Sequence, residues 1–219
     1  MKDAEYIRRE YNIRFRGPAS RWSSEEINGC RRLASRIIRW SGMRGLKGLR
    51  MLDVGCALGY YTKAFYLNGF ESYGLDYSDV AIERASQLHP ECRFIHADGL
   101  NPRLDTGFDL ILCRGFSGAN THNIAYVAKW SDKYLEMLNK KGKFIFSYTS
   151  NFTGKESGDE TVNWSKKEIS EYIKLIRAQF SGIRYYNRYY FVSELLTGLS
   201  NFLKREKAKR YFYIIFTKL

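Results

Sequence analysis

The sequence predicts an α/β fold in which a mostly parallel, doubly wound sheet has helices on both faces. From residue 49 to residue 180, short apolar runs of strand length alternate with segments whose apolar residues recur at helical spacing. Strands that alternate with helices in this way pack as a parallel sheet between two helical layers. The last part of the chain is rich in aromatic and β-branched residues, which predicts an antiparallel pair at the end of the sheet.

The expected elements follow one another without a long linker. We expect strands at residues 49–54, 70–75, 93–96, 108–113 and 143–148, and helices at 60–68, 78–88, 124–138 and 165–180. The terminal strands are expected at 183–192 and 211–217, with a helix between them. Ser165 and Glu168 have the spacing of a capping box, which predicts where the last helix before these strands begins.

The chain ahead of the first strand is expected to be helical. Ser23 and Glu26 form another capping-box pattern. The helix that follows has an apolar face and a basic face, formed respectively by Ile27, Cys30, Ala34, Ile37 and Ile38 and by Arg31, Arg32, Arg36 and Arg39. We therefore divide the chain into an N-terminal helical segment, residues 1–48, and one globular domain, residues 49–219.

The basic charge of the protein lies at its two ends. The formal net charge is +13. Residues 1–50 contain 13 basic and 5 acidic residues, and residues 166–219 contain 12 basic and 4 acidic residues. The central segment, residues 51–165, contains 11 basic and 14 acidic residues and is slightly acidic. This distribution suggests a central ligand-binding core whose flanking segments meet a different, acidic partner.

Composition excludes several classes of protein. No apolar stretch approaches the roughly 20 residues of a membrane-spanning helix, and the charged N-terminal residues lack the apolar core of a signal peptide. We therefore expect a cytoplasmic protein. The four cysteines are isolated within apolar patterns and the three histidines are not spaced for shared ligation, so no metal site is expected.

A glycine-containing turn follows the first expected strand and reads Asp53-Val-Gly-Cys-Ala-Leu-Gly59. Glycine lets backbone N–H groups approach a ligand closely, and the helix that follows presents its positive end to that ligand. A dinucleotide-binding fingerprint that began at Gly55 would need glycine at positions 57 and 60. Those positions hold Ala57 and Tyr60, so the spacing argues against a dinucleotide site.

The pattern Asp53-x-Gly55-x-Ala57-x-Gly59 resembles the first motif of the class I S-adenosylmethionine-dependent methyltransferases. The ligand of that motif is a cationic sulfonium with an amino-acid tail, so a carboxylate beside the loop is favourable. The family more often has glycine where this chain has Ala57, and we expect a small adjustment of the loop there. The resemblance continues through residues 108–114 and 138–144 and covers residues 49–150.

Two further carboxylates follow expected strands at the family's spacing. Asp76 ends the second strand, where a carboxylate can accept both ribose hydroxyls, and Asp98 follows the third, where the family binds the adenine amino group. The resemblance thus implies a Rossmann-like, seven-stranded sheet and S-adenosylmethionine as the cofactor. The cofactor-binding residues that it implies are Asp53, Gly55, Cys56, Ala57, Gly59, Tyr60, Tyr61, Asp76, Tyr77, Asp98, Gly99, Cys113 and Arg114.

The segment after the fourth strand carries information about the methyl acceptor. It reads Cys113-Arg-Gly-Phe116, without the Asn/Asp-Pro-Pro-aromatic run of amino-directed methyltransferases, and an oxygen acceptor is favoured. His122, in the polar loop that follows, is a candidate general base because its ordinary pKa lies near neutrality. A surface or helix-capping histidine is the alternative. Tyr148 and Asn151 are either acceptor ligands or ordinary residues at a strand end.

The N-terminal segment mixes aromatic residues with arginines. In many relatives a segment of this kind folds over the donor pocket as a lid, and Arg14, Arg16 and Trp22 would then contact a sugar or an anionic acceptor. The alternative is that Tyr11, Phe15 and Trp22 only pack the segment against the core.

Three functions are open on these observations. The first is an O-methyltransferase acting on a small molecule, with a sugar of a surface glycan or glycolipid as acceptor; residues 163–168 are loosely similar to the tails of glycan-modifying relatives. The second is an RNA methyltransferase whose basic ends bind single strands, with a stacking surface at residues 185–191. The third is a protein in which the donor site is retained without catalysis.

Overall fold

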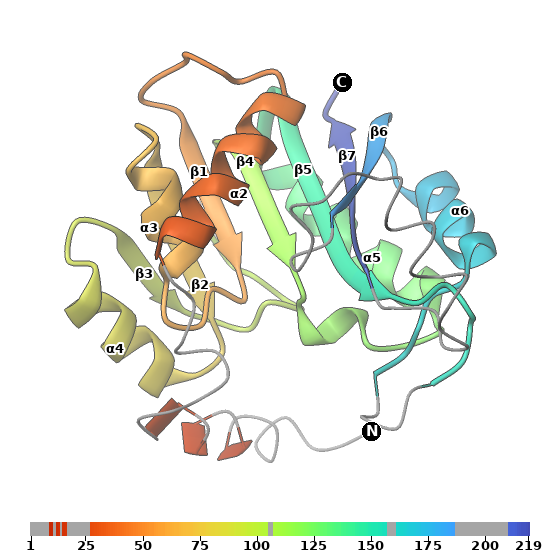
Figure 1. The fold of residues 1–219 in the computed structure, drawn as a ribbon, viewed down its shortest axis with the longest axis horizontal. Coiled ribbons are helices and arrows are strands. Elements are labelled where there is room, and N and C mark those ends of the chain that lie inside the picture. Colours follow the sequence, from red (N-terminus) through yellow and green to blue (C-terminus); the bar gives the residue numbers. More distant parts are fainter. Residues whose placement is uncertain are drawn as a thin grey trace.

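Within the described residues, seven strands form one sheet with helices on both faces (Figure 1). The computed structural model describes residues 9–10, 12–13, 15–16, 27–104, 107–156, 161–186 and 210–219. The helices are α2 (Ile27–Trp40), α3 (Tyr60–Tyr66), α4 (Asp79–Leu88), α5 (Ile124–Met137) and α6 (Lys166–Leu175), with a short 3-10 helix at Ser117–Ala119. The strands are β1 (Arg50–Val54), β2 (Glu71–Asp76), β3 (Arg93–His96), β4 (Phe108–Arg114), β5 (Leu138–Ser150), β6 (Gln179–Tyr186) and β7 (Arg210–Thr217).

The strand order is β3-β2-β1-β4-β5-β7-β6. Strands β1 to β5 pair in parallel with their neighbours, whereas β7 pairs antiparallel with both β5 and β6. The chain begins the sheet at β1 and builds outward first through β2 and β3, then through β4 and β5. This arrangement confirms the predicted doubly wound sheet with a terminal antiparallel strand.

Two hydrophobic cores hold the helices to opposite faces of the sheet. Because side chains alternate along a strand, Leu110 and Leu112 of β4 pack with α2 and α3, whereas Ile111 and Cys113 pack with α5 and α6. Figure 1 shows α2 lying across β1 and β4 on one face, with α5 behind the sheet. Every helix in the described part of the chain is too short or too polar to cross a lipid bilayer.

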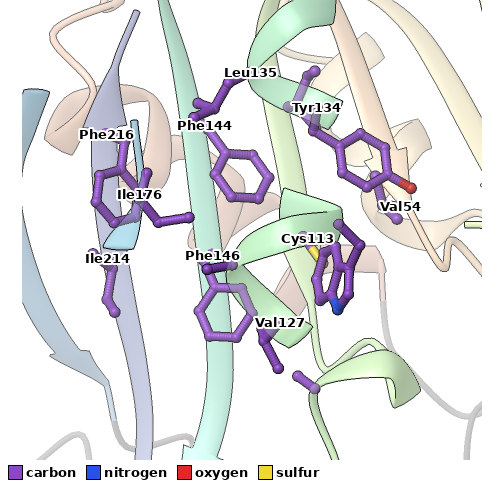
Figure 2. Close-up of a cluster of buried hydrophobic side chains, with 14 of the residues drawn as sticks. Val54, Cys113, Val127, Tyr134, Leu135, Phe144, Phe146, Ile176, Ile214 and Phe216 are labelled. Atoms are coloured by element: carbon purple, nitrogen blue, oxygen red, sulfur yellow. The ribbon is translucent and has the colours of Figure 1, made fainter. Parts of the chain in front are cut away.

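The core under α5 is built largely from aromatic rings. Figure 2 shows Phe144 and Phe146 on β5 beside Ile214 and Phe216 on β7, with Val127 of α5 nearby. All five side chains are at most 2% exposed. Burying a side chain of this size contributes about 2 to 3 kcal/mol, so these contacts hold β5, β7 and α5 together.

Some predicted boundaries were wrong. The helix predicted at residues 165–180 ends at Leu175, because Ile176 turns to an extended conformation and buries its side chain in the core. The next strand therefore begins at Gln179, four residues before the prediction, where it pairs with Thr217. Strand β5 also begins earlier than predicted, because Leu138 already pairs with Phe108.

The capping box at the start of α6 is confirmed. The side chain of Ser165 accepts a hydrogen bond from the backbone of Glu168, whose carboxylate accepts one from the backbone of Ser165. The other predicted capping box, at residues 23–26, and the helix predicted between the last two strands lie outside the described residues.

Candidate active site

A cavity of about 220 Å³ lies at the carboxyl ends of β1, β2 and β4. In open α/β sheets ligands bind at the carboxyl ends of the strands, at the point where the strand order reverses. Here that point is β1, which has β2 on one side and β4 on the other. The lining residues come from the ends of these strands, from the loops that follow β1, β3 and β4, and from the N-terminal segment. They are Phe15, Asp53, Gly55, Cys56, Ala57, Leu58, Tyr60, Tyr61, Leu75, Asp76, Tyr77, Asp98, Gly99, Leu100, Arg114, Gly115, Phe116 and Ser117.

The loop after β1 has a left-handed backbone at alternate positions. The φ angles are 73° at Gly55, 49° at Ala57 and 76° at Gly59. The two glycines adopt this conformation without strain, whereas at Ala57 it costs about 1 to 2 kcal/mol. Gly59 does not line the cavity; a Cβ there would lie 2.5 Å from the ring of Phe94, so close packing requires glycine.

Asp53 lies near the end of β1 with its side chain almost fully buried, at 4% exposure. Its Oδ2 atom accepts a hydrogen bond of 2.8 Å from the hydroxyl of Thr62. Burial raises the pKa of Asp53 to about 7, although this hydrogen bond and the positive charge of Arg114 act in the opposite direction. The cavity therefore contains a carboxylate that lacks full compensation for its charge.

Asp76, at the end of β2, joins that strand to the loop after β1. Its Oδ2 accepts a hydrogen bond from the backbone N–H of Ala57, and its Oδ1 accepts one from the backbone N–H of Ser78, each over 2.9 Å. Burial raises the pKa of Asp76, and these two hydrogen bonds oppose the rise. Its carboxylate lies on the cavity wall, in a position fixed by the backbone.

The opposite wall is formed by the loops after β3 and β4. Asp98 is exposed, and its Oδ1 accepts the backbone N–H of Leu100 at 2.8 Å. The ring of Phe116 packs so closely on the adjoining loop that a Cβ at Gly99 would lie 2.8 Å from it. Phe116 also makes an edge contact with Trp130 of α5, with ring centroids 5.2 Å apart, which fixes the ring as part of the wall.

Arg114, the last residue of β4, places a guanidinium in the cavity. Its central carbon lies 4.5 Å from the ring centroid of Tyr61 and 4.5 Å from that of Tyr211. The Nε atom donates to the hydroxyl of Tyr213 over 3.4 Å. Cys113 was predicted to bind the cofactor, but alternation along β4 turns its thiol into the core beneath α5, where it is fully buried, and it is not among the residues that line the cavity.

The charges around the cavity favour a cationic ligand. Among the described lining residues, Asp53, Asp76 and Asp98 are acidic and Arg114 is basic. A dinucleotide would bring its pyrophosphate against these carboxylates, whereas a sulfonium cation with a ribose would be attracted by them and hydrogen-bonded to them. No group of histidine, cysteine and acidic side chains within the described ranges is arranged to hold a metal ion.

A family model described as a methyltransferase domain matches residues 46–210, which includes every wall of the cavity except Phe15. The chain belongs to this methyltransferase family. The match confirms the predicted family and enzyme class, with S-adenosylmethionine as the methyl donor. No curated protein matches the sequence of this methyltransferase.

Solved structures share the fold of the methyltransferase at low sequence identity. Magnesium protoporphyrin IX methyltransferase from Synechocystis, solved with bound S-adenosylmethionine, is 13% identical with a TM-score of 0.66, covering 100% of this chain and 98% of its own. The 1,6-didemethyltoxoflavin-N1-methyltransferase from Burkholderia thailandensis is 15% identical with a TM-score of 0.69, covering 98% and 88%. The cyclase SpnF is 16% identical with a TM-score of 0.63, covering 86% and 80%. Since a cyclase shares the fold, the fold alone does not define the reaction.

Three residues predicted to serve the acceptor, His122, Tyr148 and Asn151, do not line the cavity of the methyltransferase. Nδ1 of His122 lies 2.5 Å from Oε1 of Glu168. The hydroxyl of Tyr148 donates to Asn120 at 2.8 Å, and this tyrosine is 4% exposed. The side chain of Asn151 accepts hydrogen bonds from the backbone and hydroxyl of the residue two positions on. Tyr148 and Asn151 therefore have structural partners that account for them.

These contacts fasten the loop after β4 to the chain before α6. The side chain of Asn120 accepts a hydrogen bond of 2.8 Å from the backbone N–H of Val162. The carbonyl of Thr121 accepts one of 3.0 Å from the indole N–H of Trp164. Glu168 completes the connection through His122. Although burial acts to raise the pKa of Glu168, hydrogen bonds from Ser165 and His122 outweigh it and lower the pKa below its usual value.

The N-terminal segment reaches the cavity through Phe15, one of the aromatic residues that the alternative interpretation packs against the core. Phe15 is 2% exposed, contacts Leu58 and Ala81, and lines the cavity. Its carbonyl accepts a hydrogen bond from Arg84 of α4. Arg16 is exposed and does not line the cavity, and Arg14 and Trp22 lie outside the described residues.

Proposed function

We propose that this methyltransferase binds S-adenosylmethionine in the cavity at the ends of β1, β2 and β4 and methylates an oxygen of a small molecule. The observation that carries the proposal is the joint presence of Asp53, Asp76 and Asp98 around one cavity beside the glycine loop. In this arrangement Asp76 accepts hydrogen bonds from the ribose hydroxyls, and Asp98 accepts a hydrogen bond from the adenine amino group. Gly55 and Gly99 line the cavity, and the absence of a Cβ at each leaves room for the ring of Phe116 in its wall.

The donor supplies an activated methyl group, which moves to the acceptor by in-line displacement as the sulfur–carbon bond breaks and an oxygen–carbon bond forms. The protein contributes positioning and exclusion of water. Phe15, Leu58 and Phe116 provide apolar walls for this purpose. The acceptor proton must leave as the bond forms, so a hydroxyl acceptor of ordinary acidity requires a base.

His122 is the base in this proposal. It lies in the segment after β4, between the short 3-10 helix and α5, and its side chain is 41% exposed. Glu168 holds Nδ1, which fixes the ring and directs the other nitrogen away from α6. The alternative role of the His122–Glu168 pair is purely structural: it would only hold the loop after β4 against α6.

An oxygen acceptor is supported by the residues after β4. Arg114-Gly-Phe-Ser117 leaves this strand without the proline-containing run that holds an amino nitrogen in other methyltransferases. The likeness of residues 163–168 to glycan-modifying relatives carries less weight, because Asn163 and Trp164 are fully buried and hydrogen-bonded within the protein. A sugar hydroxyl of a glycan or glycolipid remains the acceptor class that we propose to test first.

RNA is the second candidate acceptor, and one observation favours it. Residues 27–50 contain seven basic residues and no acidic residue. Of these, Arg31, Arg32 and Arg39 project from α2 and are exposed. Such a surface suits a phosphate backbone. Part of the aromatic segment predicted to stack on bases, from residue 187 onward, lies outside the described residues.

A methyl-transfer assay with isotopically labelled donor distinguishes these acceptors. The enzyme is incubated with glycolipid and free-glycan fractions, with total RNA and with buffer alone, and label is measured in each acceptor. The proposal expects label on a glycan that is stable to mild base, as an ether is. Label confined to RNA, lost on ribonuclease treatment and on raising salt, would support the second candidate instead.

A further inference from the structure

We propose that the solvent-facing side of α2 and the turn after it dock on a membrane surface that carries anionic lipids. Five exposed basic residues form this basic surface: Arg31, Arg32, Arg39, Arg44 and Lys47. Residues 27–70 contain eight basic residues and one acidic residue, Asp53, which lines the cavity and is 4% exposed. The docking surface goes beyond the proposed function, and it can be tested without methyl transfer.

The cations of the basic surface have no acidic partner among the described residues. None of the five side chains forms an ion pair or donates a hydrogen bond within that part of the chain. By contrast, Lys63 of the adjacent helix α3 pairs with Glu91 over 2.7 Å. Uncompensated charge of one sign attracts a surface of the opposite sign, and the headgroups of anionic lipids supply such a surface.

The carboxyl end of α2 does not require these cations. Basic side chains often interact with the carbonyl groups that a helix leaves without partners at this end. Here the carbonyls of Ile37 and Ile38 accept hydrogen bonds from the backbone N–H groups of Ser41 and Met43, over 2.9 and 3.0 Å. The hydroxyl of Ser41 also donates to both carbonyls. The end of the helix is therefore satisfied without Arg39 or the basic residues of the turn.

A groove of about 320 Å³ lies between the turn after α2 and the end of α3. Arg39, Arg44 and Lys47 line it, and no acidic residue is among its described lining residues. The buried side chains of Ile38 and Met43, each 7% exposed, give the groove an apolar floor. Cationic side chains around an apolar floor match a lipid, whose phosphate adjoins an apolar portion.

Exposed apolar side chains beside the groove favour a bilayer over a nucleic acid. Leu46 lines the groove and is 52% exposed. At the end of α3, Tyr66 and Leu67 are 38% and 42% exposed, and the next residue, Asn68, lines the groove. The interfacial region of a bilayer removes such side chains from water while basic side chains reach the phosphates. A nucleic-acid backbone would contact the cations alone.

The direction of α2 relates the basic surface to the cavity. Figure 1 shows α2 beginning at the end of the sheet where β1 and β4 have their arrowheads, which is the end that holds the cavity, and running to the opposite edge. A membrane that lies along α2 therefore comes close to the cavity end of the sheet. This proximity matters for a glycolipid acceptor, and that link alone rests on the proposed function.

Co-sedimentation with vesicles tests the docking surface. Binding of the full chain is measured to vesicles of phosphatidylcholine and to vesicles that also contain about 30% phosphatidylserine, an anionic lipid. One variant combines Arg39→Gln, Arg44→Gln and Lys47→Gln, and a second combines Leu46→Ser with Leu67→Ser. The matched control removes three exposed lysines of α5, β5 and α6 by Lys129→Gln, Lys140→Gln and Lys174→Gln.

The wild-type protein is expected to bind the anionic vesicles and to bind phosphatidylcholine alone at least about 100-fold more weakly. The triple variant of the basic surface should lose about 100-fold in affinity for anionic vesicles, or about fivefold per charge. The leucine variant should lose about 10-fold at unchanged charge. The lysine control should lose at most about threefold, because its charges lie away from the docking surface. Thermal melts verify that each variant is folded.

Three results would overturn the proposal. The first is a wild-type protein that does not bind the anionic vesicles. The second is an equal loss in the two triple variants, which would show an effect of net charge alone. The third is binding of a single-stranded RNA oligonucleotide that depends on Arg39, Arg44 and Lys47 but not on the two leucines, together with no vesicle binding. Intact vesicle binding without methyl transfer to any glycolipid would count against the proposed acceptor only.

Discussion

The backbone N–H of Ala57 donates a hydrogen bond to Oδ2 of Asp76 over a distance of 2.9 Å. This bond connects the loop after β1 to the end of β2, and so it couples the two segments expected to surround the ribose. Ala57 makes it from a left-handed conformation, with a φ angle of 49°. The carboxylate is thus held by the same loop whose Gly55 lines the cavity.

Replacing Asp76 with alanine is expected to weaken donor binding by about 100-fold or more, because two charge-assisted hydrogen bonds to the ribose are lost. Calorimetry with S-adenosylhomocysteine measures the loss, and a thermal melt verifies that the variant is folded. The 2′-deoxy form of the ligand provides the control. Removing the hydroxyl should weaken binding to the wild-type protein and make little further difference to the variant. Unchanged affinity in Asp76→Ala would place the ribose elsewhere.

The tight packing behind the loop after β1 predicts a stability difference between two glycines. Gly59→Ala is expected to lower the free energy of unfolding by about 3 kcal/mol, from left-handed strain together with overpacking against Phe94. Gly42 has nearly the same φ angle, 74° against 76°, but open space around its Cα. Gly42→Ala should therefore cost only about 1 kcal/mol.

Urea unfolding of both variants measures the difference, and Ala57→Gly completes the set. That substitution relieves strain at Ala57 while adding freedom to the unfolded chain, so its effect should stay within about 1 kcal/mol of zero. Equal losses for Gly42→Ala and Gly59→Ala would show that contact with Phe94 has no energetic importance.

The raised pKa of Asp53 predicts that the free protein loses stability as the pH rises. The pKa is about 7 in the folded state against an ordinary 3.8, so protonation favours folding. The contribution is fully present below about pH 4 and is lost as the pH passes through 7. Asp53→Asn removes the burial of charge and should stabilise the free protein at pH 8 by about 1 to 4 kcal/mol.

Donor binding should depend on pH in the opposite sense, because a cationic donor is attracted by the ionised form of Asp53 on the cavity wall. Affinity for S-adenosylmethionine is expected to fall as the pH drops below 7, by at most about tenfold per unit. The variant Asp53→Asn should show weak binding without this dependence. A pH profile of stability that was the same in Asp53→Asn and the wild-type protein would contradict the account of this carboxylate.

His122→Ala separates the two roles of the pair with Glu168. As a general base His122 should contribute about 100-fold or more to kcat with little effect on the donor KM. A fastening role alone would lower the free energy of unfolding by about 1 kcal/mol and leave kcat unchanged. The measurement is kcat and the urea midpoint for His122→Ala beside Asn123→Ala, which changes the same loop at the cap of α5. Full turnover in His122→Ala would remove it as the base.

The sequence predicted the mostly parallel sheet because the sheet depends on local patterns. Apolar runs and helical spacing predicted the alternation of strands and helices, and parallel strands bring Asp53, Asp76 and Asp98 to one edge of the sheet, around one cavity. The end of α6 was missed because Ile176 leaves the helix to fill a core formed by distant strands. No local signal marks that position.

The acceptor side could not be predicted as well, because it depends on contacts between distant segments. Tyr148 continues the alternation of Phe144 and Phe146 on β5, which was a signal for burial rather than for ligand binding. The partner of His122 is 46 residues away in sequence. Phe116 follows Arg114 closely, and its role in the wall follows only from its packing against Gly99.

The most direct test of the central claim is calorimetric titration of the purified wild-type protein with S-adenosylmethionine and, in parallel, with NADH. The account predicts saturable binding of S-adenosylmethionine in a one-to-one complex and no binding of NADH, with the affinity sharply reduced in Asp76→Ala. Binding of NADH without binding of S-adenosylmethionine would contradict it.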